Sequence, residues 1–312
     1  MIFINSIKAA IFYAMILISA CFGFLFALTP AIPFILLNRR IYFRWCSFVM
    51  GYLLLMITCL LEDLLNIKIV VTGDDLTNDK KRSLIIVNHR TRLDWMYIWM
   101  LHGRYQILNQ LKIILKAQLK HIPCLGWGCQ HVGFLFLERA WTKDQQTMKN
   151  SMIDNVDDVT IGYEGNFPVT ELDLLKGVLP KVVHFHVKRY SINDLSQKDE
   201  KIGQWLQNCW DEKENRLKEF YTKNQFDSPS KRFNNQQIES HIRFQRRLAL
   251  ILWILFILFW SYCLIAYIKI KLYVLIVCLF HVVIEAFANG IIDFVCQLDA
   301  NYRQKHRAIK QD

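Results

Sequence analysis

Seven consecutive residues combine the side chains that acid–base chemistry on an alcohol requires. Asn88 to Asp94 read NHRTRLD and hold one imidazole, one carboxylate and two guanidinium groups. If the Asp94 carboxylate accepts the Nδ1 proton of His89, it fixes the imidazole tautomer and leaves Nε2 free as a base. Near neutral pH such a base can take a proton from an alcohol. The stretch therefore indicates a catalytic pair of His89 and Asp94.

The neighbouring residues indicate where the alcohol and a phosphate would come from. The stretch from Ser83 to Trp99 contains no cysteine, and its one serine, Ser83, lies at the far end of an apolar run. The alcohol would therefore belong to the substrate. Arg90 and Arg92 could hold a phosphate group of that substrate, because a guanidinium matches phosphate oxygens bidentately.

The elements around this stretch must bring the two side chains together. The apolar run from Leu84 to Val87 predicts a buried strand, and His89 follows at its carboxyl end, where α/β folds place reactive groups. Asp94 lies five residues on, so His89 must precede a helix whose first turn contains Asp94. A simpler interpretation is a first-turn carboxylate on a capped helix with solvated arginines. The residues alone leave both interpretations open.

Composition indicates a membrane-attached protein with one mid-sized soluble portion. Of 312 residues, 53% are hydrophobic and 21% charged, which is too apolar for an ordinary soluble domain and too charged for spanning helices alone. The formal net charge is +11. Basic residues cluster beside apolar segments, which favours anionic lipid headgroups as the partner, and no nucleic-acid-binding motif is present.

Neither disulfides nor metals are indicated. The nine cysteines are scattered without a Cys-x-x-Cys pair, which favours reduced thiols and a soluble portion that faces the cytosol. His184 and His186 share one face of a predicted strand. A metal site would need further ligands that the sequence does not offer, so we expect no metal.

Four apolar segments could contact a membrane. Ala9 to Leu37 is long enough to span a bilayer, and the arginines at 39, 40 and 44 would place its end in the cytosol. Cys46 to Leu61 is shorter, and a second span and an interfacial helix both remain open. Leu248 to Ile268 and Leu272 to Phe287 predict a helical hairpin.

The second helix of this hairpin carries two ionisable residues that would share one side, His281 and Glu285. A mutual hydrogen bond, snorkelling and a functional site are the alternatives.

Residues 62–240 read as mixed α/β. Predicted strands cover IKIVVTG, SLIIVNH, VGFLFLER and VVHFHVKRY. LDWMYIWMLHG predicts a helix, and the segment from Asp199 to Tyr221 predicts a charged amphipathic one. Strands that alternate with helices imply a mixed, partly parallel sheet flanked by helices.

Two motifs resemble the signatures of glycerophospholipid acyltransferases. NHRTRLDWMYIW resembles the first signature, Asn-His followed by four residues and Asp, as it stands in the lysocardiolipin acyltransferase-like branch. Gly133, Phe136 and Arg139 match the second, Gly-x-x-Phe-x-x-Arg. VVHFHVKRY, the tryptophan-rich helix and the terminal hairpin are also similar to that branch, so the resemblance covers nearly the whole chain.

The resemblance implies a membrane-bound acyltransferase. His89 would be the general base and Asp94 its orienting carboxylate, and the substrate hydroxyl would attack an acyl-CoA thioester with no acyl-enzyme. Substrate-binding residues would be Asn88, Arg90, Arg92, Lys116, Gly133, Phe136 and Arg139, with Lys120 as a further helper. No cofactor is expected besides the co-substrate acyl-CoA. The partners would be a lysophospholipid of the lysophosphatidic acid, lysocardiolipin or lysophosphatidylinositol type and a bilayer with anionic headgroups.

On this basis five segments are expected. They are an N-terminal membrane anchor (1–61), an acyltransferase core (62–167), a soluble extension with the amphipathic helix (168–245), a membrane hairpin (246–290) and a basic tail (291–312). The resemblance also implies an endoplasmic reticulum membrane, with the catalytic portion facing the cytosol.

The chain departs from the family pattern at one place. The third signature, Phe-Pro-Glu-Gly-Thr, and a fourth, proline-containing one are absent, and Glu164-Gly165 lacks the residues around it that would make it the third. An internal deletion with a junction between Asn155 and Asp158 would remove a central strand. We therefore expect either a sheet that pairs again around a shortened core or a poorly folding product. Either way, this chain would show weak or no activity, and the alternative function is a non-catalytic relative that binds lipid or a partner.

Overall fold

The chain folds into two compact units. The computed structural model describes residues 2–76, 81–140, 144, 153–195, 199–226, 236–295 and 297. The first unit comprises Met1–Ala14, Leu55–Leu108 and Met148–Leu248. The second unit comprises Met15–Leu54, Asn109–Thr147 and Ala249–Asp312. Three long helices, α1 (Ile2–Gly23), α3 (Arg39–Cys59) and α9 (Gln236–Ala266), each contribute residues to both units.

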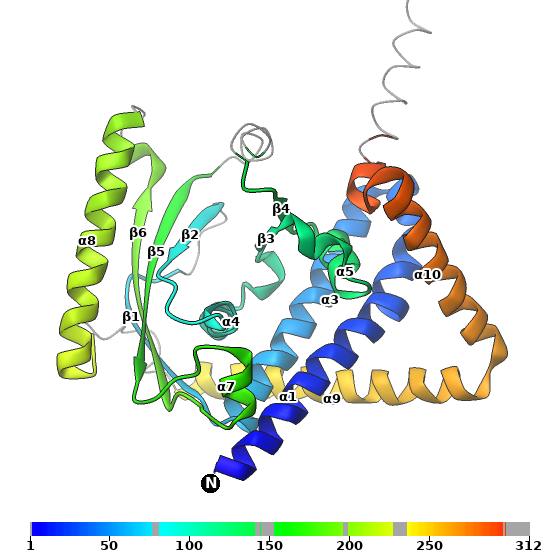
Figure 1. Ribbon diagram of the computed structural model, residues 1–312, viewed down its shortest axis with the longest axis horizontal. Coiled ribbons are helices and arrows are strands. Elements are labelled where there is room, and N and C mark those ends of the chain that lie inside the picture. The colour runs from blue at the N-terminus through cyan, green and yellow to red at the C-terminus, as the bar shows by residue number, and fades with distance from the viewer. Residues whose placement is uncertain are drawn as a thin grey trace, which may run out of the picture. The chain divides into compact units, whose positions relative to one another are not determined.

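A four-stranded sheet forms the centre of the first unit (Figure 1). Its order is β1 (Lys68–Gly73), β6 (Val182–Ser191), β5 (Asn155–Glu164) and β2 (Ser83–Val87). β1 runs parallel to β6 and β2 runs parallel to β5, whereas β5 and β6 are antiparallel. The predicted mixed, partly parallel sheet flanked by helices is confirmed.

Helices cover both faces of this sheet because β5 is apolar or ion-paired on both sides. Tyr163 packs against α4 (Asp94–Arg104), with 5.6 Å between the ring centroids of Tyr163 and Tyr97. The alternate residue Gly162 faces α8 (Asp199–Lys223), where the Phe220 ring leaves no room for a Cβ atom. Figure 1 shows α8 and α4 on opposite sides of the sheet. A strand buried on both faces has no polar alternation.

β5 was not predicted from the sequence, although it begins at the expected junction. It starts at Asn155 and pairs with β2 on one side and β6 on the other. The pairing of Val87 with Val159 brings the end of β2 directly beside it. Residues 155–158 therefore lie inside a continuously paired sheet.

The expected boundary between residues 167 and 168 does not separate two folding units. β6 belongs to the segment 168–245, yet it hydrogen-bonds to β1 and β5 of the segment 62–167. Conversely, residues 109–147 of the expected core fall in the second unit. The compact units do not follow the sequence segments here, because strand partners are chosen by pairing across the sheet and not by order along the chain.

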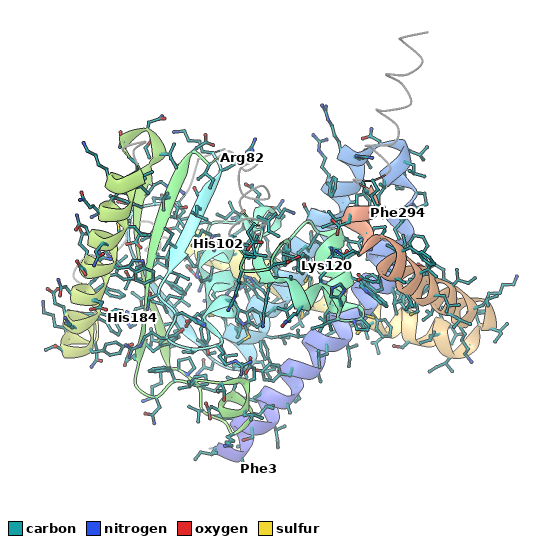
Figure 2. The ribbon with its side chains drawn as sticks, turned by 45° about the horizontal axis from the view of Figure 1, so that its top comes forward. Phe3, Arg82, His102, Lys120, His184 and Phe294 are labelled. Carbon is teal, nitrogen blue, oxygen red and sulfur yellow. The ribbon has the colours of Figure 1, made fainter. Side chains whose placement is uncertain are left out.

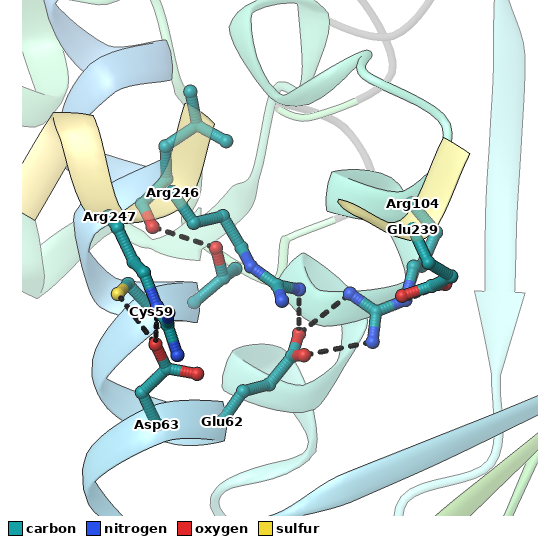
Figure 3. A network of polar contacts seen from close by, with 9 residues as sticks. Cys59, Glu62, Asp63, Arg104, Glu239, Arg246 and Arg247 are labelled. Atoms are coloured by element: carbon teal, nitrogen blue, oxygen red, sulfur yellow. Dashed lines mark hydrogen bonds and ion pairs between the residues drawn. The ribbon is translucent and has the colours of Figure 1, made fainter. Parts of the chain in front are cut away.

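A buried ion-pair network holds the C-terminal end of α4 (Figure 3). Arg104 donates two hydrogen bonds to Glu62, at 2.9 and 2.8 Å, and both side chains are about nine-tenths buried. Glu62 lies on η3 (Leu60–Leu64), a π-helical turn that follows α3, and it also accepts from Arg246 of α9. Arg104 Nε lies 3.1 Å from Glu239. The network ties α4, which begins at Asp94, to two long helices.

The second unit contains a small parallel sheet of β3 (Ile114–Lys116) and β4 (Leu135–Leu137), with α5 (Leu125–His131) between them in sequence. The strand predicted over VGFLFLER is thus limited to three residues. The remaining short elements of the chain are η1 (Phe24–Leu28), η2 (Thr29–Ala31), α2 (Phe34–Leu37), η4 (Leu108–Gln110), η5 (Ala117–His121), α7 (Glu171–Leu175) and η6 (Ile192–Asp194).

His281 and Glu285 do not pair with each other, although both lie on α10 (Ile268–Ala288). His281 Nε2 lies 3.0 Å from His131 Nε2, and its Nδ1 donates to the Val277 carbonyl at 3.0 Å. The Glu285 carboxylate instead accepts from His121 and Gln130, at 2.6 and 2.8 Å. The mutual hydrogen bond suggested by their spacing was wrong because each residue finds a partner outside the helix.

Four helical segments are long and apolar enough to cross a membrane. They are Ile2–Ala31, Arg39–Leu64, Glu239–Ala266 and Ile268–Ala288, of 30, 26, 28 and 21 residues. The segment that contains Cys46 to Leu61 is therefore long enough to span, because its helix begins earlier than the apolar run. Four such helices are typical of a membrane protein.

Candidate active site

The NHRTRLD stretch forms a tight turn between a strand and a helix. β2 ends at Val87 and α4 begins at Asp94, so the six residues between them reverse the chain at the carboxyl end of β2. Asp94 is the first residue of α4, where a carboxylate is favoured by the helix dipole. The predicted arrangement, with His89 before the helix and Asp94 in its first turn, is what the structure has.

His89 and Asp94 are hydrogen-bonded in the orientation that a base requires. Nδ1 of His89 donates to Oδ2 of Asp94 at 2.9 Å. The side chain of His89 is 73% exposed, whereas that of Asp94 is 3% exposed. Because Nδ1 carries the proton, Nε2 has a free lone pair at the surface. The buried carboxylate thus fixes the tautomer and the exposed nitrogen is available for a proton.

Asp94 receives three further hydrogen bonds. The backbone N–H groups of Arg90 and Thr91 donate to Oδ2 at 2.8 and 3.1 Å, and the hydroxyl of Tyr163 donates to Oδ1. Together with Nδ1 of His89, four donors therefore fix the orientation of the carboxylate. The backbone donors explain the turn, since they wrap residues 89–91 around the carboxylate. Tyr163 was missed from the sequence because it lies 69 residues along the chain from Asp94.

Asn88 links the turn to the neighbouring strand. Its side-chain nitrogen donates to the carbonyl of Ile161 at 3.0 Å, and its side-chain oxygen accepts from the N–H of Ile161 at 2.7 Å. Asn88 is 5% exposed. The amide therefore continues the β2–β5 ladder by one step beyond Val87. Both polar atoms of the side chain therefore bond to β5.

Arg90 and Arg92 lie on the exposed side of the turn. The guanidinium of Arg90 stands 4.9 Å from the ring centroid of Tyr221 on α8. Arg92 Nε lies 3.5 Å from Glu171, and the two side chains are 68% and 41% exposed. An exposed pair of this kind contributes about 0–1 kcal/mol, so an arriving anion can take over the guanidinium at little cost.

The other expected substrate-binding residues lie in the second unit. Phe136 is the middle residue of β4, where it pairs with Leu115 of β3. Gly133 precedes the strand with a φ of +73°, a conformation that suits glycine. Lys116 ends β3, and Arg139 follows β4 by two residues. The parallel pairing therefore brings Lys116 and Arg139 to the same edge of this small sheet.

Arg139 itself is held in an exposed loop. Its φ is +62°, and the backbone N–H groups on either side of it, those of Glu138 and Ala140, both donate to the carboxylate of Asp144 at 3.0 Å. Lys120 differs from the expectation. It is 9% exposed and its Nζ lies 2.6 Å from Asp293, so its charge is used within the fold.

The two strand histidines face partners within the first unit. His184 lies on the side of the sheet that α8 covers, with its ring centroid 5.0 Å from that of Phe220 (Figure 2). Its Nε2 is 3.7 Å from Glu164. His186 Nδ1 lies 3.1 Å from the hydroxyl of Thr72. Within the described ranges, no three His, Cys, Asp or Glu side chains gather closely enough to hold a metal ion.

Comparisons with known proteins identify the family of the chain. A family model described as Acyltransferase matches residues 68–162, and one described as Acyltransferase C-terminus matches residues 173–256. Lysocardiolipin acyltransferase 1 of Danio rerio is 32% identical over 290 residues, with 72% of this chain and 74% of the relative covered. The Mus musculus protein of the same name is 29% identical, with 96% of both chains covered. Lysophosphatidylinositol acyltransferase 10 of Caenorhabditis elegans is 29% identical, with 67% of this chain and 71% of the relative covered.

Two further comparisons concern length and fold. The alignment with the mouse protein runs over 372 positions, whereas this chain has 312 residues, so the mouse protein carries residues without a counterpart here. The solved 1-acyl-sn-glycerophosphate acyltransferase PlsC of Thermotoga maritima covers 65% of this chain and 93% of its own, at 13% identity and a TM-score of 0.44.

Proposed function

Because the chain belongs to the glycerophospholipid acyltransferase family, we propose that it transfers a fatty acyl group from acyl-CoA to the free hydroxyl of a lysophospholipid. The observation that carries the proposal is the His89 side chain, whose Nδ1 is held on a buried carboxylate while Nε2 is exposed. The enzyme is an O-acyltransferase, and His89 is its general base.

The reaction needs no group beyond the two substrates and this pair. Nε2 of His89 takes the proton of the lysophospholipid hydroxyl, and the hydroxyl oxygen attacks the thioester carbonyl of acyl-CoA. The carbon–sulfur bond breaks, and the CoA thiolate leaves with the proton that His89 carried. Asp94 stabilises the imidazolium that forms between these steps. No cofactor and no metal are required.

Direct transfer is supported by what surrounds His89. Among the described residues, Asp94 is the hydrogen-bond partner of its imidazole, and no serine, threonine or cysteine side chain bonds to Nε2. A chain that formed an acyl-enzyme would need such a nucleophile next to its base. The substrate hydroxyl therefore takes that place.

Charges and apolar side chains beside the turn suit a lysophospholipid. Arg90 and Arg92 offer exposed guanidiniums for the phosphate. Trp95 and Val169 are 40% and 53% exposed, and Val169 accepts a hydrogen bond from the Arg92 backbone at 3.0 Å. Exposed apolar side chains next to exposed cations favour a substrate that has both a fatty chain and an anionic headgroup.

The family's second signature supplies further contacts to the headgroup. Arg139 and Lys116 offer cations at one edge of the small sheet, and Gly133 and Phe136 shape the segment before Arg139. Asn88 acts on the substrate indirectly, by fixing the turn to β5. We place the protein in the endoplasmic reticulum membrane, with the catalytic portion facing the cytosol.

The second candidate function is a non-catalytic relative that binds lipid or a partner chain. It is favoured by the absence of Phe-Pro-Glu-Gly-Thr from the sequence. Because that signature completes the phosphate site in the family resemblance, we expect slower transfer than from a relative that retains it. Equal rates from the two proteins would show that the signature is dispensable.

The test is acyl transfer from labelled oleoyl-CoA to a panel of lysophospholipids. Membranes that contain the full chain are compared with membranes that contain the His89→Ala variant, and a His241→Ala variant serves as the control because His241 is an exposed histidine on α9. Transfer that is lost in the first variant and retained in the second supports the enzyme. No transfer above the His89→Ala level, with folded protein present, supports the non-catalytic relative. Intact mass after oleoyl-CoA alone should show no acyl adduct.

A further inference from the structure

The hydroxyl of Tyr163 is the one side-chain hydroxyl in the described chain that donates to the carboxylate of Asp94. We infer that Tyr163 is a positioning residue of the acyltransferase site, which holds Asp94 in place and weakens its pull on the proton of His89. The resulting order is Tyr163, Asp94, His89, with the substrate hydroxyl at the exposed end. The effect on rate rests on the function proposed above, whereas the effect on the protonation of His89 does not.

Strand β5 brings Tyr163 to this place through its register with β2. Val87 pairs with Val159, and the side chain of Asn88 bonds to the backbone of Ile161. Tyr163 is the next residue on that face of β5, because side chains alternate along a strand. One strand thus holds both ends of the 88–94 turn, with a backbone contact at Asn88 and a hydroxyl contact at Asp94.

The hydroxyl is a permanent donor. Tyr163 is 1% exposed, and its ring is fixed by Phe167, with stacked ring centroids 4.8 Å apart. Burial, and then the nearby Asp94 charge, hold the pKa of Tyr163 well above its usual range. The phenol therefore keeps its proton at every pH at which the protein works. It can only donate to the carboxylate and never competes with it for the His89 proton.

The other ionisable groups around Asp94 come from three elements. His89 and Arg90 lie on the turn itself, Tyr97 lies on α4, and Tyr221 of α8 stands beside Arg90 and near Tyr163. Burial raises the pKa of Tyr97, so that side chain is neutral too. The hydroxyl of Tyr97 has no hydrogen-bond partner in the described part of the chain. Tyr97 is therefore a matched control for Tyr163, since it is an equally buried phenol near the same carboxylate.

The sign of the effect follows from the charge. A hydrogen bond to Oδ1 draws electron density from the carboxylate, so the protonated imidazole is stabilised less than it would be without Tyr163. Removal of the hydroxyl leaves three donors on Asp94 and a stronger attraction for the imidazolium. His89 then holds its proton to higher pH. A hydrogen bond to a charged group contributes about 1.5–3 kcal/mol, and a part of this energy acts on the His89 proton. That part corresponds to a shift of about half to one pH unit in the midpoint at which His89 loses its proton.

The test reads the protonation of His89 without relying on catalysis. Diethyl pyrocarbonate modifies neutral imidazole, and His89 is exposed enough to react. The rate of modification of the peptide that contains His89 is followed by mass spectrometry from pH 5 to 9 on the full chain in detergent. Wild type, Tyr163→Phe and Tyr97→Phe are compared, and acyl transfer from oleoyl-CoA is measured over the same pH range.

We expect the midpoint of modification to rise by about half to one pH unit in Tyr163→Phe and to stay unchanged in Tyr97→Phe. The acid limb of the transfer rate should move by the same half to one pH unit, which lowers the rate on that limb by about three- to ten-fold. A merely structural role of Tyr163 would lower the amount of folded protein and leave the midpoint where it is. Equal midpoints in wild type and Tyr163→Phe overturn the inference.

A second measurement tests whether the effect of Tyr163 passes through the charge of Asp94. In Asp94→Asn the negative charge is gone, so adding Tyr163→Phe should not shift the midpoint of His89 modification any further. If Tyr163→Phe shifts the midpoint by the same amount in Asp94→Asn as in wild type, the inference is overturned. If the midpoints behave as expected and no variant or wild type transfers acyl groups, the proposed function fails and the positioning role stands. If transfer depends on His89 but the midpoints are equal, the proposed function stands and the positioning role of Tyr163 fails.

Discussion

Replacement of Asn88 by alanine should release the catalytic turn from the sheet. The substitution removes the 3.0 and 2.7 Å hydrogen bonds to Ile161 and leaves a buried backbone N–H and a buried C=O of that residue without their partner. Each unsatisfied buried group costs about 1–3 kcal/mol, so the turn should lose about 2–6 kcal/mol of local stability. Over most of that range the loss is smaller than a domain stability of about 5–15 kcal/mol, and the chain should still fold.

Hydrogen exchange measures this loss where it occurs. The N–H of Ile161 is a donor to Asn88, so its exchange reports the contact directly. A loss of about 2 kcal/mol corresponds to roughly 30-fold faster exchange. Acyl transfer should fall with it, because the turn that carries His89 is no longer held at the end of β2. Asn88→Asp should be intermediate, since a carboxylate still accepts from the N–H but cannot donate to the carbonyl.

The matched control is Asn166→Ala, because Asn166 is an exposed asparagine on the segment after β5. It should leave both exchange at Ile161 and transfer unchanged. If Asn88→Ala exchanges at Ile161 at the wild-type rate and keeps full transfer, then the amide contact does not position the turn. If it exchanges faster and keeps full transfer, the clamp exists but is not needed for the reaction.

Three further predictions concern β5 and its neighbours. Asp158→Asn should lower the free energy of unfolding by about 3–5 kcal/mol, because Lys213, 1% exposed and 2.5 Å from Asp158, would keep a buried charge without its counter-charge. Denaturant unfolding in detergent measures this free energy. An Asp158→Leu, Lys213→Met double variant removes both charges and should be more stable than Asp158→Asn, so equal stability of the two variants would contradict the prediction. Gly162→Ala should lower the free energy of unfolding by about 1–3 kcal/mol, since its Cβ would stand 2.7 Å from the Phe220 ring. In the same unfolding assay, adding Phe220→Leu should recover part of this loss. A Gly162→Ala variant that unfolds at the wild-type denaturant concentration would refute the clash. Burial, aided by neighbouring cations, lowers the pKa of His186 to about 4, so stability is complete above the usual value of 6.5 and is lost as the pH falls from there toward 4. Melting temperatures from pH 7 to 4 should fall less for His186→Gln than for wild type, and parallel curves would argue against it.

Most of the first unit could be predicted from apolar patterns. β2, β6, α4 and α8 lie within two residues of the expected segments, and the His89 turn has the predicted geometry. These elements are recognisable because their apolar residues repeat with the period of a strand or helix, and because polar residues mark where the chain turns.

β5 could not be predicted because its pattern is interrupted by two adjacent aspartates. Asp157 is paired with Arg189 of the neighbouring strand, at 2.6 and 3.0 Å, and Asp158 with Lys213 of α8. Each partner is more than 30 residues away in sequence or on another element. In the sequence the two adjacent charges are therefore typical of a loop, and only the assembled sheet shows that they are paired. Tyr163 and the Ile161 partner of Asn88 could not be predicted for the same reason, because they lie 69 and 73 residues from Asp94 and Asn88.

The family signatures located the second set of site residues but not their surroundings. The parallel pairing of β3 with β4 brings Lys116 and Arg139 to one edge, although β3 is only three residues long and has no apolar periodicity to detect. Lys120 was expected beside them on the strength of its charge alone, and it is used by Asp293 instead. A basic residue is therefore only a candidate for binding the headgroup. Whether its charge is available depends on its ion pairs within the fold, which the sequence does not show.

The most direct test of His89 as general base is the transfer rate of the full chain against His89→Ala and Asp94→Asn, with saturating oleoyl-CoA and the best acceptor. A positioned general base contributes about 10²–10⁴-fold, so both variants should lose at least about 100-fold, while the melting temperature of the exposed-site variant His89→Ala stays close to wild type. A folded His89→Ala variant that transfers acyl groups within a few-fold of the wild-type rate would contradict the account.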